Sequence, residues 1–176
     1  MLSQFTDKEG RKTLFDITIF PKQVYPVGHL DFYSEGLLLL TDDKALIDFL
    51  LNQRRKHEKK YYVQVEGIPD KDVLQKLFGG VIIQGEKALP AIAKFIKDPL
   101  FPPRIPPIRG RKNIPDSWIS LTIIEGKNRH VRKMTAYIGF PTLRLIRVRI
   151  KNITLGNLLP GSSRELLKKE VLDLKT

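Results

Sequence analysis

One aspartate is the clearest candidate for a reacting group in this chain. Asp31 stands between two apolar segments, Val24–Leu30 and Leu37–Leu40, which we expect to form strands, the second of them buried. A carboxylate held at the end of a strand can serve as a nucleophile or as a proton acceptor. The segment from Asp31 to Gly36 also has the Asp, Ser and Gly of a loop, and on spacing alone a turn-forming role for Asp31 is the stronger interpretation.

A second group of reactive residue types lies between Glu125 and Met134. Gly126 and Asn128 mark a turn into a helix that we expect from Asn128 to Ile138. Three cations of that helix, Arg129, Arg132 and Lys133, lie three or four residues apart and share a face. Such a face can bind phosphates or pair an arginine with a buried carboxylate. The alternative is a solvated helix surface, and the surrounding positive charge favours the binding role.

The third group is Lys59-Lys60-Tyr61-Tyr62. Successive residues of a strand face opposite sides, so one tyrosine can pack in the core while the other faces a cleft. An exposed aromatic ring among cations is a surface on which an unpaired base stacks. For either tyrosine taken alone, core packing is the stronger interpretation.

The charge of the chain is positive and uneven. Its 176 residues include 31 Lys and Arg against 19 Asp and Glu, a net charge of +12. Between Arg104 and Lys151 there are twelve basic residues and two acidic ones, so ten of the net charges fall there. Soluble surfaces normally mix the two signs. The pattern predicts a face that binds a polyanion, nucleic acid first and an anionic membrane surface as the alternative.

Other features exclude several classes of protein. No stretch approaches the roughly 20 apolar residues that span a bilayer, and the first residues lack the pattern of a secretory signal. Cysteine is absent, so disulfides and thiolate metal sites are excluded. These features are compatible with the cytoplasm.

The remaining pattern predicts the elements that position these groups. Asp42 or Asp43 caps a helix through Leu50, and Asp70 caps a helix to Phe78 that Gly79-Gly80 ends. Five prolines between Pro99 and Pro107 predict a stiff loop. Further strands are expected at 61–66, 81–83, 91–96, 118–124 and 143–150, and further helices at 8–19 and 164–174. Strands outnumber helices and intermingle with them, so we predict one α+β domain over residues 1–176 with a mixed, mostly antiparallel sheet.

Taken together, these groups resemble a known family. Gly28-His29-Leu30-Asp31 followed by Ser34 to Thr41 resembles the catalytic motif of the RsuA/RluB/RluE/RluF family of ribosomal pseudouridine synthases. Lys59-Lys60-Tyr61 resembles its Lys-x-Tyr element. Glu125–Met134 resembles its segment Glu-Gly-Arg-Asn-Arg-Gln-Val-Arg-Arg-Met. The resemblance extends from Gln4 to about Leu159 and is closest to the E-type synthases that act on the large ribosomal subunit.

The resemblance implies a fold, a reaction and roles for residues. The fold is the pseudouridine synthase fold, with helices flanking the sheet and a central cleft. The reaction converts a specific uridine of large-subunit (23S) ribosomal RNA to pseudouridine without a cofactor or metal. Asp31 takes the position of the catalytic aspartate, Tyr61 that of the tyrosine that stacks on the extruded base, and Arg132 that of the arginine that pairs with the aspartate.

Phosphate contacts that hold the RNA are expected from the basic stretch. The residues we expect to supply them are Arg109, Arg111, Lys112, Lys127, Arg129, Lys133, Arg144 and Arg147. We expect the enzyme to act as a monomer in the cytoplasm, with ribosomal RNA or an assembling subunit as its partner.

Two departures from the family pattern stand out. Most of the family has Arg two residues before the aspartate, where this chain has His29. His29 can stack in the space left by a flipped base, but it lacks a permanent charge, so weaker base extrusion and a harmless variation are equally supported. The family also has a Lys-Pro strand ahead of the position of Met1, so we expect that strand to be missing here, together with the S4 RNA-binding domain that several relatives carry.

Two rival hypotheses remain open. One is a catalytically weak or inactive RNA-binding or ribosome-assembly protein on the same fold, which His29 and the missing strand favour. Intact Asp31, Tyr61 and Arg132 count against it. The other is a metal-dependent nuclease that uses carboxylates to hold Mg²⁺. Its ligands would be Asp31, Glu35, Asp42 and Asp43.

Overall fold

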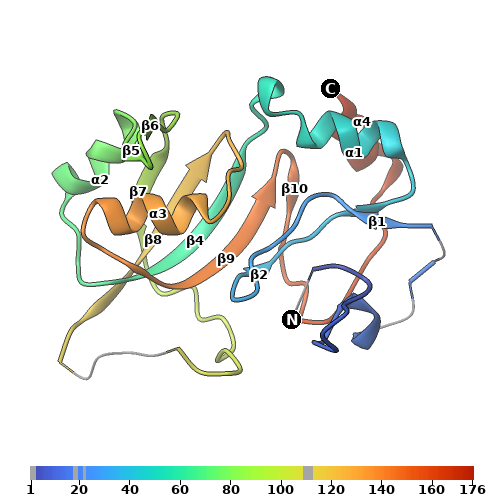
Figure 1. Ribbon diagram of the computed structural model, residues 1–176, viewed down its shortest axis with the longest axis horizontal. Coiled ribbons are helices and arrows are strands. Elements are labelled where there is room, and N and C mark those ends of the chain that lie inside the picture. The colour runs from blue at the N-terminus through green and yellow to red at the C-terminus, as the bar shows by residue number, and fades with distance from the viewer. Residues whose placement is uncertain (1–2, 18–19, 22, 109–112) are drawn as a thin grey trace.

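A six-stranded mixed sheet forms the centre of the protein. The computed structural model describes residues 3–17, 20–21, 23–108 and 113–176. Within these residues the strands run in the order β10-β9-β4-β8-β7, and β2 joins the sheet beside β9 (Figure 1). The β2–β9 pair is parallel and the other neighbours are antiparallel. The bounds are β2 Glu35–Gly36, β4 Lys59–Glu66, β7 Ile92–Ile96, β8 Asp116–Ile123, β9 Thr142–Ile150 and β10 Ile153–Thr154.

In the described part of the chain, two small sheets and four helices lie around the main sheet. One small sheet pairs β1 (Tyr25–Pro26) with β3 (Leu40–Thr41), and the other pairs β5 (Ile82–Ile83) with β6 (Glu86–Lys87). The helices are α1 Lys44–Leu51, α2 Lys71–Phe78, α3 His130–Tyr137 and α4 Lys168–Lys175, and short 3₁₀ turns occupy Leu14–Asp16 and Gln53–Arg55.

The apolar residues form two cores. In the first, the alternating residues Tyr61, Val63 and Val65 of β4 pack against side chains of β8, α2 and α3. In the second, α1 and α4 pack on the ends of β9 and β10 through Leu46, Leu50, Ile150, Ile153 and Leu174 (Figure 1). Asp31 lies on the chain that extends from the second core toward β9.

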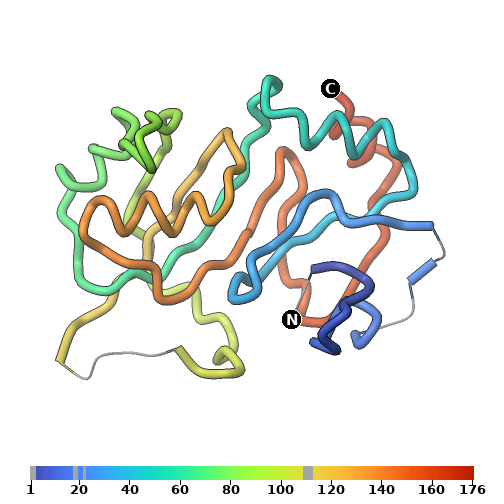
Figure 2. Tube along the Cα trace, in the orientation of Figure 1, coloured from blue at the N-terminus to red at the C-terminus, as the bar shows by residue number. Residues whose placement is uncertain are grey.

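That connection determines where the aspartate lies. The chain runs from β1 out to β9, where β2 pairs with it, and returns to β3 beside β1 (Figure 2). At Gly36 the backbone has φ +101°, and a Cβ there would overlap the backbone oxygen of Arg147. Glycine is therefore required at this crossing, because only glycine adopts that conformation freely and leaves room for the neighbouring strand.

The predicted fold class is confirmed, and most predicted elements form within a few residues of their expected bounds. Asp43 and Asp70 cap α1 and α2 by accepting hydrogen bonds from Leu46 N at 3.0 Å and Val73 N at 2.7 Å. The expected strand Val24–Leu30 is wrong in extent, because only Tyr25–Pro26 pairs in a sheet. The predicted loop at 31–36 contains β2, and of the strand expected at Leu37–Leu40 only Leu40 lies in a strand, β3. Neither β6 nor β10 was predicted. In place of the helix expected at 8–19, the described residues form one 3₁₀ turn.

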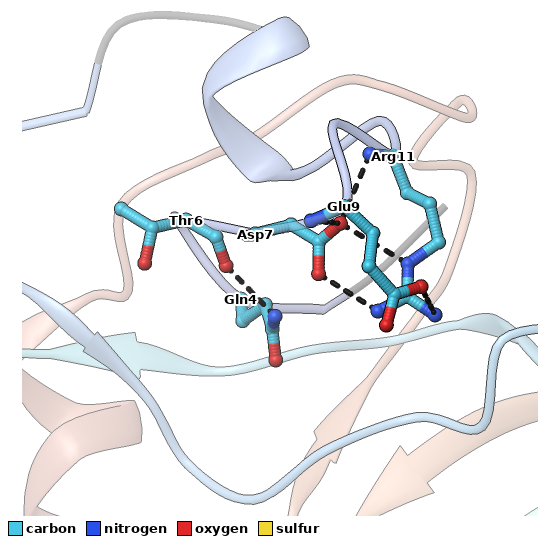
Figure 3. Close-up of polar contacts among 5 residues, drawn as sticks. All are labelled: Gln4, Thr6, Asp7, Glu9 and Arg11. Atoms are coloured by element: carbon cyan, nitrogen blue, oxygen red, sulfur yellow. Dashed lines mark hydrogen bonds and ion pairs between the residues drawn. The ribbon is translucent and has the colours of Figure 1, made fainter.

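The N-terminal segment is held by a local polar cluster and packs on the loop that carries Asp31. Asp7 accepts hydrogen bonds from Glu9 N and from the backbone and side chain of Arg11 (Figure 3). Those bonds, chiefly the one from the Arg11 side chain, lower the pKa of Asp7 from 3.8 to about 2. At the start of the segment, Ser3 bonds to the loop: Leu30 N donates to Ser3 Oγ at 2.8 Å, and Ser3 Oγ donates to Leu30 O at 3.2 Å. The segment therefore fixes the residue that precedes Asp31.

Candidate active site

Asp31 begins a tight turn between β1 and β2. Ser34 N donates to Asp31 O at 2.8 Å, which closes the turn. The Asp31 side chain keeps 29% of its surface exposed, so it is partly shielded but open to a ligand. The turn role inferred from spacing is therefore present, and it leaves the carboxylate available for chemistry.

Arg132 reaches this turn from α3. Its Nε lies 3.8 Å from Asp31 Oδ2, and its Nη2 donates to Tyr33 O at 3.0 Å. The Arg132 side chain is 13% exposed, and burial lowers the pKa of its guanidinium, with the charge of Arg129 acting in the same direction. The structure thus brings together the predicted Asp31–Arg132 pair, and the arginine also anchors the backbone of the turn.

Tyr61 lies on β4 and faces the first core. It stands opposite Leu121 of β8 and Arg147 of β9 in the sheet register, and it is 9% exposed. Its neighbour Tyr62 is on the opposite face and lies near Phe101, with ring centroids 6.3 Å apart. Tyr61 therefore combines core packing with a position facing the cleft.

A cavity of about 160 Å³ joins these groups. Asp31 lies at one side, Tyr61 and Lys59 of β4 lie along the sheet, and Arg129 and Val131 come from the start of α3. The convergence of a few charged side chains from distant parts of the chain on one cavity is typical of a ligand-binding site.

Two cations of this cavity were not recognised as a pair from the sequence. Arg147 is 4% exposed; its Nε donates to Leu37 O at 2.8 Å, and its buried Nη2 has no hydrogen-bond partner among the described residues. Burial lowers the pKa of Lys59, and the charge of Arg147 lowers it further. Lys59 could have been predicted from the Lys-Lys-Tyr motif, because residues two apart on a strand, such as Lys59 and Tyr61, face the same side.

A buried contact between His130 and Glu125 holds the start of α3 in place. His130 Nε2 lies 2.8 Å from Glu125 Oε1, and the same oxygen accepts a hydrogen bond from Leu89 N at 2.7 Å. Burial lowers the pKa of His130, against the opposing effect of Glu125. These contacts fix the turn from which Arg129 reaches the cavity and Arg132 reaches Asp31.

The other predicted RNA-binding residues fall into distinct places. His29 and Arg129 line the cavity and are exposed, with His29 Nδ1 3.3 Å from Ser3 O. Lys127 lies on the surface at 2.8 Å from Glu86 Oε2, and Lys133 Nζ donates to Gln84 Oε1 at 2.7 Å. Arg109, Arg111 and Lys112 lie outside the described residues.

Arg144 requires a correction. It is 8% exposed and forms two hydrogen bonds to Glu35, at 2.9 and 2.8 Å, and a third to Pro102 O at 2.9 Å. Because its guanidinium is already engaged inside the protein, we remove Arg144 from the expected phosphate contacts. Arg147 is also buried but faces the cavity, so we no longer expect it to contact a phosphate at the surface.

Two of the carboxylates that the nuclease hypothesis requires as metal ligands are already bound to other residues. Glu35 pairs with Arg144, and Asp43 caps α1 while it binds Lys175 at 2.8 Å. Within the described part of the chain no group of three or more His, Asp or Glu side chains could hold a metal ion. No helix in that part is both long and apolar enough to cross a membrane.

Comparisons with known proteins identify relatives over most of the chain. Residues 7–137 match the family model described as RNA pseudouridylate synthase. The ribosomal large subunit pseudouridine synthase E of Vibrio parahaemolyticus is 51% identical over 94% of this chain and 69% of its own length. Its counterpart in Xanthomonas campestris is 47% identical over 93% and 89%. The ribosomal large subunit pseudouridine synthase B of Bacillus subtilis is 35% identical over 99% and 67%.

A solved structure supports the same fold. The crystal structure of a pseudouridylate synthase superposes with a TM-score of 0.77 at 24% identity. The superposition covers 92% of this chain and 65% of that protein.

Proposed function

The chain belongs to the RNA pseudouridylate synthase family, and on this premise we propose that it converts a uridine of large-subunit ribosomal RNA to pseudouridine. The observation that carries the proposal is the Asp31–Arg132 pair, 3.8 Å apart, beside a cavity that Asp31 and Tyr61 both line. The names of the relatives at 47% to 51% identity supply the substrate class.

The proposed reaction is a rearrangement within one nucleotide. The N1–C1′ bond of the uridine breaks, the uracil turns, and a C5–C1′ bond forms. The hydrogen leaves C5 and N1 gains one, so no atom is gained or lost overall. A cofactor is therefore not required by the balance of the reaction.

Each residue of the site has a role in that sequence. Asp31 acts as a carboxylate at the ribose, and Arg132 holds that carboxylate and the turn that carries it. Tyr61 stacks on the extruded base and assists the late loss of the proton from C5. The target base must leave its stack to enter the cavity, which costs a few kcal/mol.

The RNA backbone is held around the mouth of the cavity. Arg129 and His29 line the opening, and Lys127 and Lys133 extend the positive surface along the start of α3. We propose that these residues contact phosphates and the strand beside the extruded base, and that such contacts position the RNA without reading its sequence. We further propose that the enzyme acts as a monomer in the cytoplasm.

The test uses large-subunit RNA transcript that carries tritium at C5 of uridine. The C5 hydrogen must depart when C5 becomes the glycosidic carbon, so release of tritium reports this reaction. Release by the wild type, unaffected by EDTA and abolished in Asp31→Asn, is the expected result. RNA binding without release from RNA or from intact subunits would contradict the proposal and favour a binding protein on the same fold. Loss of activity in EDTA would favour a metal-dependent reaction.

A further inference from the structure

Two cations that line the cavity, the half-buried Lys59 and the buried Arg147, lack an anionic partner among the described residues. Among the described residues, neither Lys59 nor Arg147 has a carboxylate within ion-pair distance, and Arg147 Nη2 has no hydrogen-bond partner. By contrast Arg132, Arg144 and Arg149 each have one. Partial burial lowers the pKa of Lys59, and the like charge of Arg147 lowers it further, so the charged form of Lys59 is disfavoured in the absence of an anion. An anion bound between the two side chains would offset the free-energy cost of keeping both of them charged in the cavity.

The position of the pair identifies the part of the substrate that it meets. Arg147 stands directly opposite Tyr61 across β4 and β9, and Lys59 lies two residues before Tyr61 on the same face of the strand. Both side chains line the cavity together with Tyr61 and Asp31. If Tyr61 stacks on the uracil, the two cations lie beside that ring. Phosphates of the RNA backbone are better matched by the exposed cations at the mouth, because Arg147 is 4% exposed.

We propose that Lys59 and Arg147 bind the departing uracil and stabilise the negative charge that it acquires when the glycosidic bond breaks. This inference rests on the proposed function. When the N1–C1′ bond breaks, its electron pair stays on the uracil, and the charge is shared by N1, O2 and O4. The electron deficiency at C1′ is met by the Asp31 carboxylate, which bonds to C1′ or accepts a proton from C2′.

The total charge of the site is unchanged in that step, but its location changes. One negative charge moves from Asp31, beside Arg132, to the base, beside Lys59 and Arg147. When C5 then bonds to C1′, the uracil loses its charge to the new bond, Asp31 is restored as a carboxylate, and the C5 proton leaves as N1 gains one. Fixed donors aimed at the place where charge develops lower the barrier strongly, because they need no reorganisation during the reaction.

The experiment compares Lys59→Met with Lys60→Met. Lys60 is on the same strand but faces the other side, with Nζ 5.8 Å from the centre of the Tyr62 ring. Both variants remove one charge and keep an unbranched side chain. Conversion of the target uridine under single-turnover conditions is measured by chromatography of nuclease digests, and the RNA dissociation constant by filter binding. Lys59→Met should lower the conversion rate by about 10²–10³-fold. Lys60→Met should stay within about threefold of the wild type.

A second substrate separates leaving-group stabilisation from a structural role. In RNA that contains 5-fluorouridine, fluorine withdraws electrons and makes the departing base a weaker base, so its anion depends less on the cations. C5 of this base carries fluorine and has no proton to lose, so pseudouridine is not formed from it, and the rate measured is the disappearance of the N1-linked nucleoside. The rate deficit of Lys59→Met should shrink at least about tenfold with this substrate. Lys59→Arg, which keeps the charge, should recover most of the rate with uridine. Arg147→Lys keeps the charge of the second cation while losing Nη2, and it should lie between the wild type and Lys59→Met.

The outcomes are distinct. A wild type that converts neither uridine nor 5-fluorouridine would contradict the proposed function itself. An active wild type with Lys59→Met equal to Lys60→Met would overturn only the present inference. The same deficit with both bases would also overturn it, and it would indicate a structural role. A loss of RNA affinity that accounts for the whole deficit would assign Lys59 to a phosphate instead.

Discussion

Replacing Arg132 by Gln removes the side chain that joins α3 to the turn carrying Asp31. At 3.8 Å, and with an effective dielectric constant of about 20, the attraction between the two charges is roughly 4 kcal/mol. That value is an upper limit, because Asp31 is 29% exposed. If the whole of this energy is lost from the transition state, the rate falls by about 10³-fold, which is the largest effect we expect from the lost attraction. A displacement of about 1 Å costs about 10²-fold in rate, so we expect a fall of about 10²–10³-fold.

The assay is tritium release from C5 under single-turnover conditions with saturating enzyme, so that RNA affinity does not enter the rate. The matched control is Arg149→Gln, which removes an arginine of the same domain from a 2.7 Å ion pair with Glu58. The control should keep a rate within about threefold of the wild type, because pairs exposed to this extent contribute little. If Arg132→Gln and Arg149→Gln behave alike, the contact with Asp31 does not position the reacting group, and the reasoning fails.

Three further predictions concern stability. Gly36→Ala should lower the free energy of unfolding by about 2–4 kcal/mol, measured by urea denaturation, because φ is +101° and a Cβ would overlap the backbone of Arg147. In the wild type, that free energy should fall as the pH drops below about 6.5, because the buried His130 binds protons less readily than the unfolded chain does. His130→Gln should have a shallower pH dependence of its urea midpoint between pH 7.5 and 5, and an unchanged slope would contradict this. Asp70→Ala should lower the free energy of unfolding, measured by thermal unfolding, by about 1 kcal/mol, because it removes the 2.7 Å hydrogen bond that caps α2. Asp70→Ser can still cap the helix and should retain most of that stability.

Elements with a local signal could be predicted from the sequence. The caps of α1 and α2 form as expected, because an aspartate three residues before a helical N–H needs no distant partner. The aromatic and β-branched residues at 61–66 likewise predict a strand, and β4 forms there, beginning two residues earlier at Lys59. Asp31, Tyr61 and Arg132 could be named only through their resemblance to a family, since their separation along the chain conceals their proximity.

Features that depend on distant pairing could not be predicted. The β2–β9 pair joins residues more than 100 positions apart, and it forms from two residues in a segment with the composition of a loop. The same crossing explains why Val24–Leu30 does not form a long strand, because Val27 N donates to Leu39 O and Leu37 N to Arg147 O. The backbone N–H and C=O groups of this connection are hydrogen-bonded partly to the chain that returns to β3 and partly to β9, so they do not form one continuous strand ladder.

The basic stretch shows how far net charge can be interpreted. Arg144 and Arg147, on the strand expected at 143–150, were predicted to contact RNA. Both are buried by what covers the faces of β9: Arg144 is bound to Glu35, and Arg147 donates to Leu37 O and faces the cavity. A period of two identifies the two faces of a strand and says nothing about what covers the second face. We therefore expect the exposed cations around the cavity, rather than the net charge of +12, to determine the salt dependence of RNA binding.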